Sequence, residues 1–403
     1  MTRADGRKNL TCLTYCAMPY SGSGWPQSCV NILSEFSRHG IEPVVSLPRA
    51  RIDRPANIGF DPCLRFPLSR LPWNTIKPFA ERRLAQAFRS RLDRADPAST
   101  IAYLWPGTPP AIVEHARRRG IITVREMINC TMATAKPILD QAYRRAGLQP
   151  AHGITEEAAK AERTELSLYD YVFASNPCAE GSLIKAGIER SRILSASFGW
   201  EPARFSGEAV PRRNDTFRAL FVGTACVRKG VPELIQAWVQ SGVRGELLIV
   251  GDVEPCLADR VGDAAAHHAV RLVPFTANLT ELYHSCDVFV FPTLEEGGPQ
   301  VTLEAGGCGL PVITTPMGAS RLVEHGRNGL LVAPGDVGEL ADALTLLASN
   351  AALRQRFAGQ IAVDAQEFVY GRVSALRAQM LAGLMHASGV VRETEFAEIA
   401  QAR

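Results

Sequence analysis

The sequence predicts an α/β protein built from two Rossmann-like domains, each with a parallel sheet, that face each other across a cleft. The first observation is that short β-rich runs alternate with helix-length segments, which is typical of a parallel sheet covered by helices on both faces. The second is that this alternation occurs twice, on either side of a polar segment. The third is the length of 403 residues, which is too long for one ordinary hydrophobic core.

The first set of strands and helices is expected within residues 1–199. The strands are short runs rich in apolar and β-branched residues, and they lie at residues 10–17, 43–47, 100–104, 121–125 and 171–175. Helical patterns lie between them, near residues 27–39, 110–119, 155–167 and 178–187.

The second set is expected within residues 218–367. Its strands include the buried runs LFVG and VFVFP, and they lie at residues 220–223, 247–251, 270–273, 288–292, 311–315 and 329–333. Helices are expected near residues 231–241, 279–286, 301–308, 319–325 and 336–348.

The domain boundary is expected in residues 200–217, which are polar and interrupted by proline and glycine. A last helical pattern, residues 368–388, is expected to pack back on the first domain. Ligands of doubly wound sheets bind outside the carboxyl ends of the strands. The site is therefore expected in the loops that follow residues 17, 104, 125, 223, 273 and 292.

Composition argues against several classes of protein. No apolar run approaches the roughly 18 to 20 residues of a membrane-spanning helix, and the first 20 residues lack the pattern of a signal peptide. A cytoplasmic protein is therefore expected. Ten cysteines are scattered without CxxC pairs or disulfide density, so we expect free thiols and no zinc site.

Positive charge is concentrated in the first half, with 27 Lys/Arg against 18 Asp/Glu over residues 1–199. Within residues 49–94 there are eleven basic and four acidic side chains, with aromatic residues between them. This segment suits an anionic membrane surface or a phosphorylated acceptor. A solvated arginine-rich face explains it equally well. No nucleic-acid-binding motif accompanies the charge, so nucleic acid is not expected as a partner.

The densest motif is VFVFPTLEEGGPQVTLEAGG, residues 288–307. A buried strand ends at Pro292, and a helix is expected to begin near Pro299 because proline suits the first helical position. The helix terminus would then offer free backbone amides and a positive dipole to a diphosphate. Those amides belong to Gln300, Val301 and Thr302.

Two glutamates flank this helix terminus. Glu296 stands in the loop before the helix and Glu304 just inside it, with Gly297 and Gly298 between. Both can reach hydroxyl groups of a ligand whose phosphates occupy the terminus. Glu295, in contrast, is expected to be a solvated surface charge.

These words resemble the retaining glycosyltransferases of the GT-B fold, specifically the large family 4 group. Its E-x7-E motif is matched by Glu296 and Glu304, and the stretches LEAGGCGLPVI and EHGRNGLLV fit as well. The resemblance is strong over residues 218–360 and weak before that. It implies that Glu296 contacts hydroxyls of a donor sugar and that Glu304 binds the ribose of its nucleotide.

A second motif is LFVGTACVRKG, residues 220–230, in which a strand runs into a glycine loop with two cations. Preorganised cations would stabilise the leaving nucleoside diphosphate, a role for Lys229 that the resemblance supports. Thr224 follows Gly223 where the family commonly has arginine, so Arg228 is expected to supply the second charge. The base is expected near Phe275.

In the first domain, the loop in AMPYSGSGW, residues 17–25, places Gly22 and Gly24 after a strand. The family has a pair of small residues here that lets backbone approach the donor. The word ITVREMIN, residues 122–129, departs from the family because Arg125 stands where a histidine is common. Arg125 and Glu126 are therefore candidate cleft residues.

The resemblance implies that a sugar passes from a nucleoside-diphosphate donor to a saccharide or lipid-linked acceptor with retention, as part of polysaccharide or glycolipid biosynthesis. A front-face mechanism is expected, with no metal and no cofactor besides the donor substrate. Two alternatives remain open: a sugar-nucleotide epimerase of the same fold, and a sugar-nucleotide-binding protein without catalytic activity.

Overall fold

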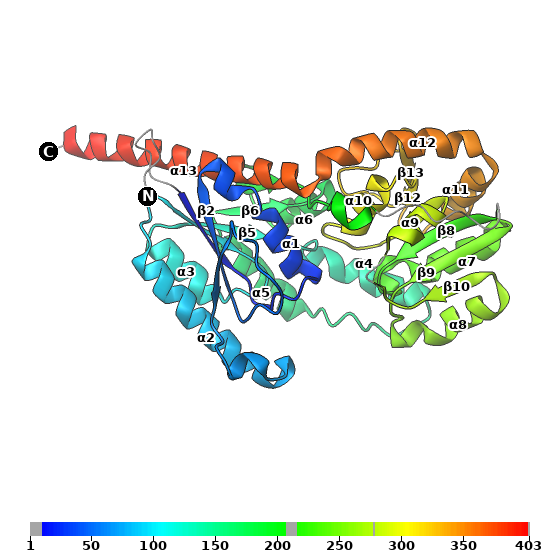
Figure 1. The fold of residues 1–403 in the computed structure, drawn as a ribbon, viewed down its shortest axis with the longest axis horizontal. Coiled ribbons are helices and arrows are strands. Elements are labelled where there is room, and N and C mark those ends of the chain that lie inside the picture. Colours follow the sequence, from blue (N-terminus) through cyan, green and yellow to red (C-terminus); the bar gives the residue numbers. More distant parts are fainter. Residues whose placement is uncertain (1–9, 207–215, 277–278, 402–403) are drawn as a thin grey trace.

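The computed structural model describes residues 10–206, 216–276 and 279–401. Two α/β domains lie side by side along the long axis (Figure 1), each built on a fully parallel sheet. The predicted fold class is confirmed. Residues 207–215, in the middle of the expected linker, lie outside the described residues.

The first domain has a seven-stranded sheet in the order β3-β2-β1-β4-β5-β6-β7. Its strands are β1 (Leu10–Tyr15), β2 (Ile41–Leu47), β3 (Gly59–Pro62), β4 (Thr100–Leu104), β5 (Ile122–Glu126), β6 (Tyr171–Ala174) and β7 (Ile193–Ser195). Its helices are α1 (Gly24–Ile32), α2 (Trp73–Arg94), α3 (Pro110–Arg118), α4 (Met132–Arg145), α5 (Glu156–Ser167) and α6 (Pro177–Lys185).

The second domain repeats this arrangement with six strands in the order β10-β9-β8-β11-β12-β13. Its strands are β8 (Phe217–Val222), β9 (Gly245–Val250), β10 (Val270–Val273), β11 (Val288–Phe291), β12 (Val312–Thr314) and β13 (Gly329–Leu331). Its helices are α7 (Val231–Ser241), α8 (Ala258–His267), α9 (Thr280–Ser285), α10 (Gln300–Gly307), α11 (Val337–Ser349) and α12 (Ala351–Asp364).

The helix expected near residues 319–325 is wrong, because this segment forms turns. Ser320 has a φ of 58°, in the left-handed region, which a right-handed helix does not contain. Turn hydrogen bonds run from the Leu322 and Val323 amides to the Ala319 carbonyl, both at 3.1 Å. The Asn328 side chain donates to the Leu322 carbonyl at 2.9 Å, so a side chain from beyond this segment takes part in the pairing of these turns.

The last helix, α13 (Tyr370–Gln401), returns from the second domain and runs along the first, as Figure 1 shows. The chain crosses between the domains twice, and a bridge between Trp200 and Val369 places the two crossings side by side. The indole of Trp200 also donates to the Ala365 carbonyl at 2.8 Å. None of the described helices has the length and apolarity needed to cross a membrane.

An ion pair anchors α13 in the first domain. Arg377 and Glu126 are both fully buried, and two guanidinium nitrogens donate to the two carboxylate oxygens at 2.6 and 3.2 Å. The carbonyls of Ala196 and Ser197 accept further hydrogen bonds from Arg377, at 2.8 and 3.0 Å. The arginine therefore closes the core of the first domain from the far end of the chain.

Candidate functional site

A pocket of about 430 Å³ lies between the domains, where α1 faces the carboxyl ends of β8 and β9 and the start of α10. The structure brings together there nine of the residues predicted from the sequence: Gly22, Gly24, Gly223, Thr224, Lys229, Phe275, Gln300, Val301 and Glu304. This position at the carboxyl ends of the strands is the one that the fold class predicts. Eleven further lining residues were not predicted, among them Gln27, Asn31, Arg204 and Leu279.

Two cations line this pocket, Lys229 and Arg204, and Arg204 is paired with Glu304. Gly223 has a φ of 133°, and a Cβ there would lie 2.5 Å from the Lys229 ammonium. The glycine therefore leaves the space in which the ammonium lies, against the end of β8. Burial lowers the pKa of Lys229, an effect that the nearby Glu296 opposes. Lys229 forms no ion pair with any described residue, so its charge is available to an anion in the pocket.

Glu304 reaches the same pocket from α10. Its carboxylate is 7% exposed and accepts hydrogen bonds from the Tyr283 hydroxyl at 3.3 Å and from Arg204 at 3.4 Å. Burial raises the pKa of Glu304, and Arg204 and Tyr283 oppose that shift. The carboxylate is thus held in a fixed place with oxygen lone pairs still available for ligand hydroxyls.

Arg228 does not line the pocket with Lys229. Its guanidinium donates to the Glu296 carboxylate, and to the Glu295 carbonyl at 3.1 Å. Burial works against the charge of Arg228, but Glu296 and Glu295 raise its pKa above the usual value. In this structure Arg228 therefore holds Glu296 in place.

The expectation that Glu295 is a solvated charge is wrong. Its side chain is 2% exposed, because the loop after β11 is pressed against the first domain. One carboxylate oxygen accepts from the backbone amide of Cys130 at 3.1 Å, and the other from Arg228 at 3.4 Å. Burial raises the pKa of Glu295, although Arg228 acts in the opposite direction.

The expectation that Arg125 and Glu126 line the cleft is also wrong. Consecutive strand residues point to opposite faces of a sheet, and here both faces are covered. Arg125 is 7% exposed and bonds to Glu165, and Glu126 pairs with Arg377 of α13. Neither lines the pocket. Their charges are used inside the first domain.

The helix terminus differs from its prediction in one respect. Helix α10 begins near Pro299, as expected, but its first residue is Gln300, and Pro299 is the N-cap instead of the first helical residue. The Thr302 amide, however, donates to the Pro299 carbonyl at 3.2 Å, and the Thr302 side chain donates to the Gly318 carbonyl at 2.9 Å. The expected free amide of Thr302 is therefore wrong, which leaves those of Gln300 and Val301 at this end of the pocket.

Gly297 and Gly298 lie where the domains touch. The Gly297 carbonyl accepts hydrogen bonds from the Ser175 hydroxyl and from the Asn176 amide, the latter at 2.7 Å. A Cβ on Gly297 would lie 2.1 Å from the Ile128 carbonyl carbon. Only glycine permits this approach of the two backbones.

Gly297→Ala is therefore expected to push the domains apart, because backbone atoms cannot move aside as the end of a side chain can. Small-angle X-ray scattering should show a larger radius of gyration than the unchanged protein. Gly359→Ala is the matched control, since a Cβ on Gly359 in α12 meets no atom within 4 Å. An unchanged scattering curve for Gly297→Ala would contradict the tight contact.

A second pocket, of about 380 Å³, lies on the other side of the loop that carries Arg228. Three carboxylates line it, those of Glu162, Glu254 and Glu295, together with apolar residues of α4. Tyr143 of α4 donates to Glu254 across the domain boundary at 2.9 Å. The sequence predicted none of these three residues as functional.

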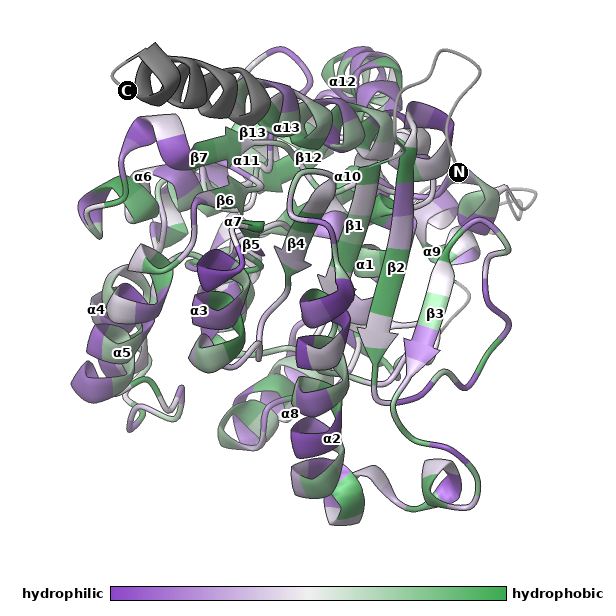
Figure 2. Ribbon diagram, turned by 90° about the vertical axis from the view of Figure 1, so that its left-hand side faces the viewer, coloured by the Kyte–Doolittle hydropathy of each residue, from purple (hydrophilic) through white to green (hydrophobic). Residues whose placement is uncertain are grey.

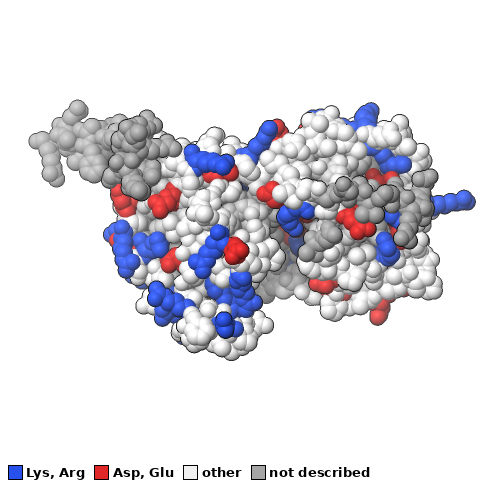
Figure 3. All heavy atoms as spheres, viewed as in Figure 1, with Lys and Arg blue, Asp and Glu red and all other residues white. Residues whose placement is uncertain are grey.

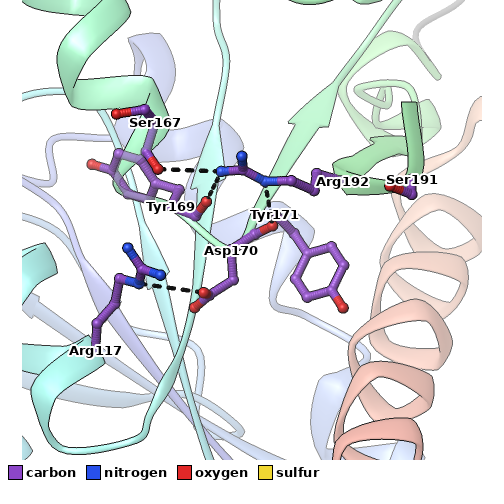
Figure 4. Close-up of a pocket in the computed structure, with 7 residues that line it drawn as sticks. All are labelled: Arg117, Ser167, Tyr169, Asp170, Tyr171, Ser191 and Arg192. Carbon is purple, nitrogen blue, oxygen red and sulfur yellow. Dashed lines mark hydrogen bonds and ion pairs between the residues drawn. The ribbon is translucent and has the colours of Figure 1, made fainter. Parts of the chain in front are cut away.

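A third hollow, shown in Figure 4, lies where β6 and β7 begin, away from the carboxyl ends of the strands. Its polar groups bond to each other: Arg192 donates to the Asp170 carbonyl at 3.1 Å, and Arg117 pairs with the Asp170 carboxylate at 3.4 Å. These contacts connect the ends of neighbouring elements, so we assign this hollow a structural role.

Known proteins resemble this chain in sequence over part of its length and in fold over nearly all of it. Residues 216–350 match the sequence model of the family described as glycosyl transferases group 1. The capsular polysaccharide biosynthesis glycosyltransferase CapM of Staphylococcus aureus is 31% identical over 47% of this chain and 52% of its own length. A D-inositol 3-phosphate glycosyltransferase of Pseudarthrobacter chlorophenolicus is 34% identical over 40% and 41%. The chain thus spans about half the length of the curated relatives it matches.

Solved structures resemble the whole chain in fold. Sucrose-phosphate synthase of Thermosynechococcus elongatus superposes with a TM-score of 0.73, at 18% identity, over 94% of this chain and all of that one. HepE of Anabaena, solved in complex with UDP and glucose, has a TM-score of 0.66 at 16% identity, over 93% of this chain and all of that one. At these identities the likeness shows the two-domain fold alone.

Proposed function

We propose that this chain, whose residues 216–350 belong to the glycosyl transferases group 1, transfers a sugar from a nucleoside diphosphate to a hydroxyl acceptor with retention at the anomeric carbon. The observation that carries the proposal is the pocket between the domains, in which the unpaired ammonium of Lys229 lies near the buried carboxylate of Glu304. A sugar nucleotide carries an anion, its diphosphate, and hydroxyl groups, those of its ribose and its sugar, so this pair of side chains suits it.

In this proposal Lys229 and the free amides at the start of α10 receive the diphosphate. Charge that develops on the leaving group is stabilised by donors already in place, so neither a metal nor a further cofactor is part of the proposal. Glu304 takes ribose hydroxyls, and the exposed ring of Phe275 lies against the base. Glu296 takes hydroxyls of the donor sugar, and Arg228 holds that carboxylate while adding positive charge next to Lys229.

The second pocket is the proposed place for the acceptor. It shares the loop of residues 226–228 with the donor side, and Glu295 stands beside Glu296. Carboxylates accept hydrogen bonds from hydroxyl groups, and the one arginine that lines this pocket is already bonded to Glu295 and Glu296. These features support a saccharide acceptor, in agreement with a role in polysaccharide or glycolipid biosynthesis like that in CapM's name.

The test is release of nucleoside diphosphate from a panel of sugar nucleotides, with and without saccharide acceptors. A transferase releases nucleoside diphosphate faster when an acceptor is added. An epimerase converts the sugar nucleotide without an acceptor, and a binding protein shows a thermal shift with a sugar nucleotide but no product. Either of the last two results would overturn the proposal.

Lys229→Ala is expected to lose more affinity for a nucleoside diphosphate than for the nucleoside, because only the diphosphate meets the ammonium. Losing one charged hydrogen bond costs about 1.5 to 3 kcal/mol, so the diphosphate should bind roughly ten- to a hundredfold more weakly. Calorimetric titration with both ligands measures this. Lys185→Ala, which changes an exposed lysine of α6 outside this pocket, is the control. An equal loss for both ligands would assign Lys229 a structural role.

The proposal also places the acceptor side near an anionic membrane, on the cytoplasmic side, if the acceptor is lipid-linked. The positive charge of residues 49–94 supports this part of the proposal.

A further inference from the structure

One part of the first domain projects from it: residues 63–83, here called the basic lobe. It consists of a 3₁₀ turn at Leu68–Arg70 and the first half of α2. In Figures 1 and 2 this end of α2, with the turn before it, extends beyond the neighbouring helices. Side chains on the lobe are therefore presented to whatever lies outside the molecule.

The basic lobe exposes four large apolar side chains. Phe66 is 74% exposed, and Phe79, Leu71 and Leu68 are 44%, 43% and 38% exposed. Single exposed apolar residues are ordinary on protein surfaces, but four between residues 66 and 79 of one projecting lobe indicate a contact surface.

Positive charges surround these apolar residues. The basic lobe has five exposed cations and one acidic residue, Glu81, and the cations are Arg65, Arg70, Lys77, Arg82 and Arg83. Blue side chains gather on the lower part of the first domain in Figure 3. The Arg70 and Arg83 guanidinium groups lie over the rings of Phe66 and Phe79, at 5.3 and 6.0 Å from the ring centroids. At two places on the lobe, a cation and an aromatic ring therefore lie next to each other.

The lobe is held in shape from beneath. Arg49 is 2% exposed and donates to the carbonyls of Ser69 and Leu71, at 2.8 and 2.6 Å. Leu64, Ile76 and Ala80 form a small core of their own under the turn. Because the exposed residues stand on this fixed support, ordering them on binding costs little conformational entropy.

We infer that the basic lobe is a docking surface for an anionic lipid bilayer. Phe66, Leu71 and Phe79 would enter the boundary between headgroups and acyl chains while the arginines meet lipid phosphates, a combination typical of peripheral membrane contacts. Leucines and arginines on one projecting lobe favour lipid over single-stranded nucleic acid, which requires a row of stacking rings along a groove. The inference rests on the membrane contact of the proposed function and names its surface, but it does not depend on the sugar-transfer reaction, since none of these residues lines either interdomain pocket.

Co-sedimentation of the full chain with vesicles tests this inference. One set of vesicles is phosphatidylcholine, and the other is phosphatidylcholine mixed with phosphatidylglycerol. Binding is expected to the mixed vesicles only and to fall as salt is raised, because exposed charges are screened beyond about 10 Å at 0.1 M. If the protein stays in the supernatant with mixed vesicles at low salt, or binds both kinds equally, the inference is overturned.

Two double variants separate the contributions. Arg82→Gln with Arg83→Gln should weaken binding about thirtyfold, since each cation near an anionic leaflet contributes about 1 kcal/mol. Phe66→Ser with Phe79→Ser should also weaken it by tenfold or more, since each ring loses apolar contact. The matched controls, Lys160→Gln with Arg163→Gln and Val363→Ser with Ile184→Ser, change exposed residues elsewhere and should bind as the unchanged protein does.

A third arm separates this inference from the proposed function. All these variants should keep the nucleotide-dependent thermal shift of the unchanged protein, which also shows that they fold. Equal loss of vesicle binding in the control variants would overturn the inference. It would show that charged and apolar residues anywhere on the surface contribute to vesicle binding as much as those of the basic lobe do. Tighter binding to a single-stranded oligonucleotide than to the mixed vesicles would likewise overturn it in favour of nucleic acid.

Discussion

Glu304→Gln and Glu296→Gln are each expected to lower sugar transfer about thirty- to a hundredfold while the protein stays folded. Glutamine keeps the volume of the side chain but removes the negative charge, and a hydrogen bond to a charged group contributes about 2 to 3 kcal/mol. Glu304 is the sharper test, because Tyr283 and Arg204 hold its carboxylate at the pocket. Release of nucleoside diphosphate in the presence of acceptor measures the change.

Glu246→Gln provides the control for these variants. Glu246 pairs with Arg218 at 3.2 Å and with Arg271 at 3.0 Å at the start of β9, away from both interdomain pockets. Its removal should leave turnover within about twofold, because Glu246 lines neither pocket. Near-normal turnover in both the Glu304 and the Glu296 variant would show that the E-x7-E positions have no role in the reaction.

Arg377→Met is expected to lower the free energy of unfolding by about 3 to 5 kcal/mol. The substitution leaves Glu126 fully buried without its cation, and the carbonyls of Ala196 and Ser197 lose their donor as well. Urea denaturation followed by circular dichroism measures the loss. The control is Arg372→Met, which changes an exposed arginine of the same helix, α13. Arg372 pairs with Glu367 of the preceding 3₁₀ turn, and losing this exposed pair should lower the free energy of unfolding by less than about 1 kcal/mol.

A double variant shows whether the loss of stability comes from leaving the Glu126 carboxylate unpaired. Arg377→Met with Glu126→Leu removes both charges and should be more stable than Arg377→Met alone, because an apolar pair often replaces a buried ion pair at little cost. If the double variant is as unstable as the sum of the two single variants, packing around the arginine accounts for the effect instead of the unpaired carboxylate.

Eleven of the thirteen strands in the described residues were predictable, because strands of a parallel sheet are buried on both faces and appear as continuous apolar runs. The run VFVF of β11 is fully buried in this way. Strands β3 and β7 and helices α4, α8 and α12 were not predicted. Helix α2 was not predicted, because its apolar positions are separated by arginines and it carries an internal proline, Pro78. Residues 319–325 gave the opposite error, a helix that was predicted but is absent from this segment. The Asn328 side chain contributes to the turns found there instead.

The pocket was predictable where a residue lies between the end of a strand and the start of the next helix, as Gly223 and Lys229 do after β8, or at that helix start, as Gln300 does after β11. The residues that hold the site in place were not predictable, because they come from distant segments: Arg204 and Tyr283 bond to Glu304, and Asn176 bonds to Gly297. The errors at Arg125, Glu126 and Glu295 share one cause. Each charge is neutralised by a partner at least 40 residues away in sequence, and no local pattern reveals such a pairing.

The return of α13 to the first domain has a consequence for biosynthesis. A chain emerging from the ribosome completes the second domain, up to α12, before Arg377 has been made. Until then Glu126 has no cation in the interior, and the site that α13 covers stays open to solvent. The domain that is translated first is therefore the one that finishes folding last. In a cell, the unfinished first domain would be the part that chaperones meet.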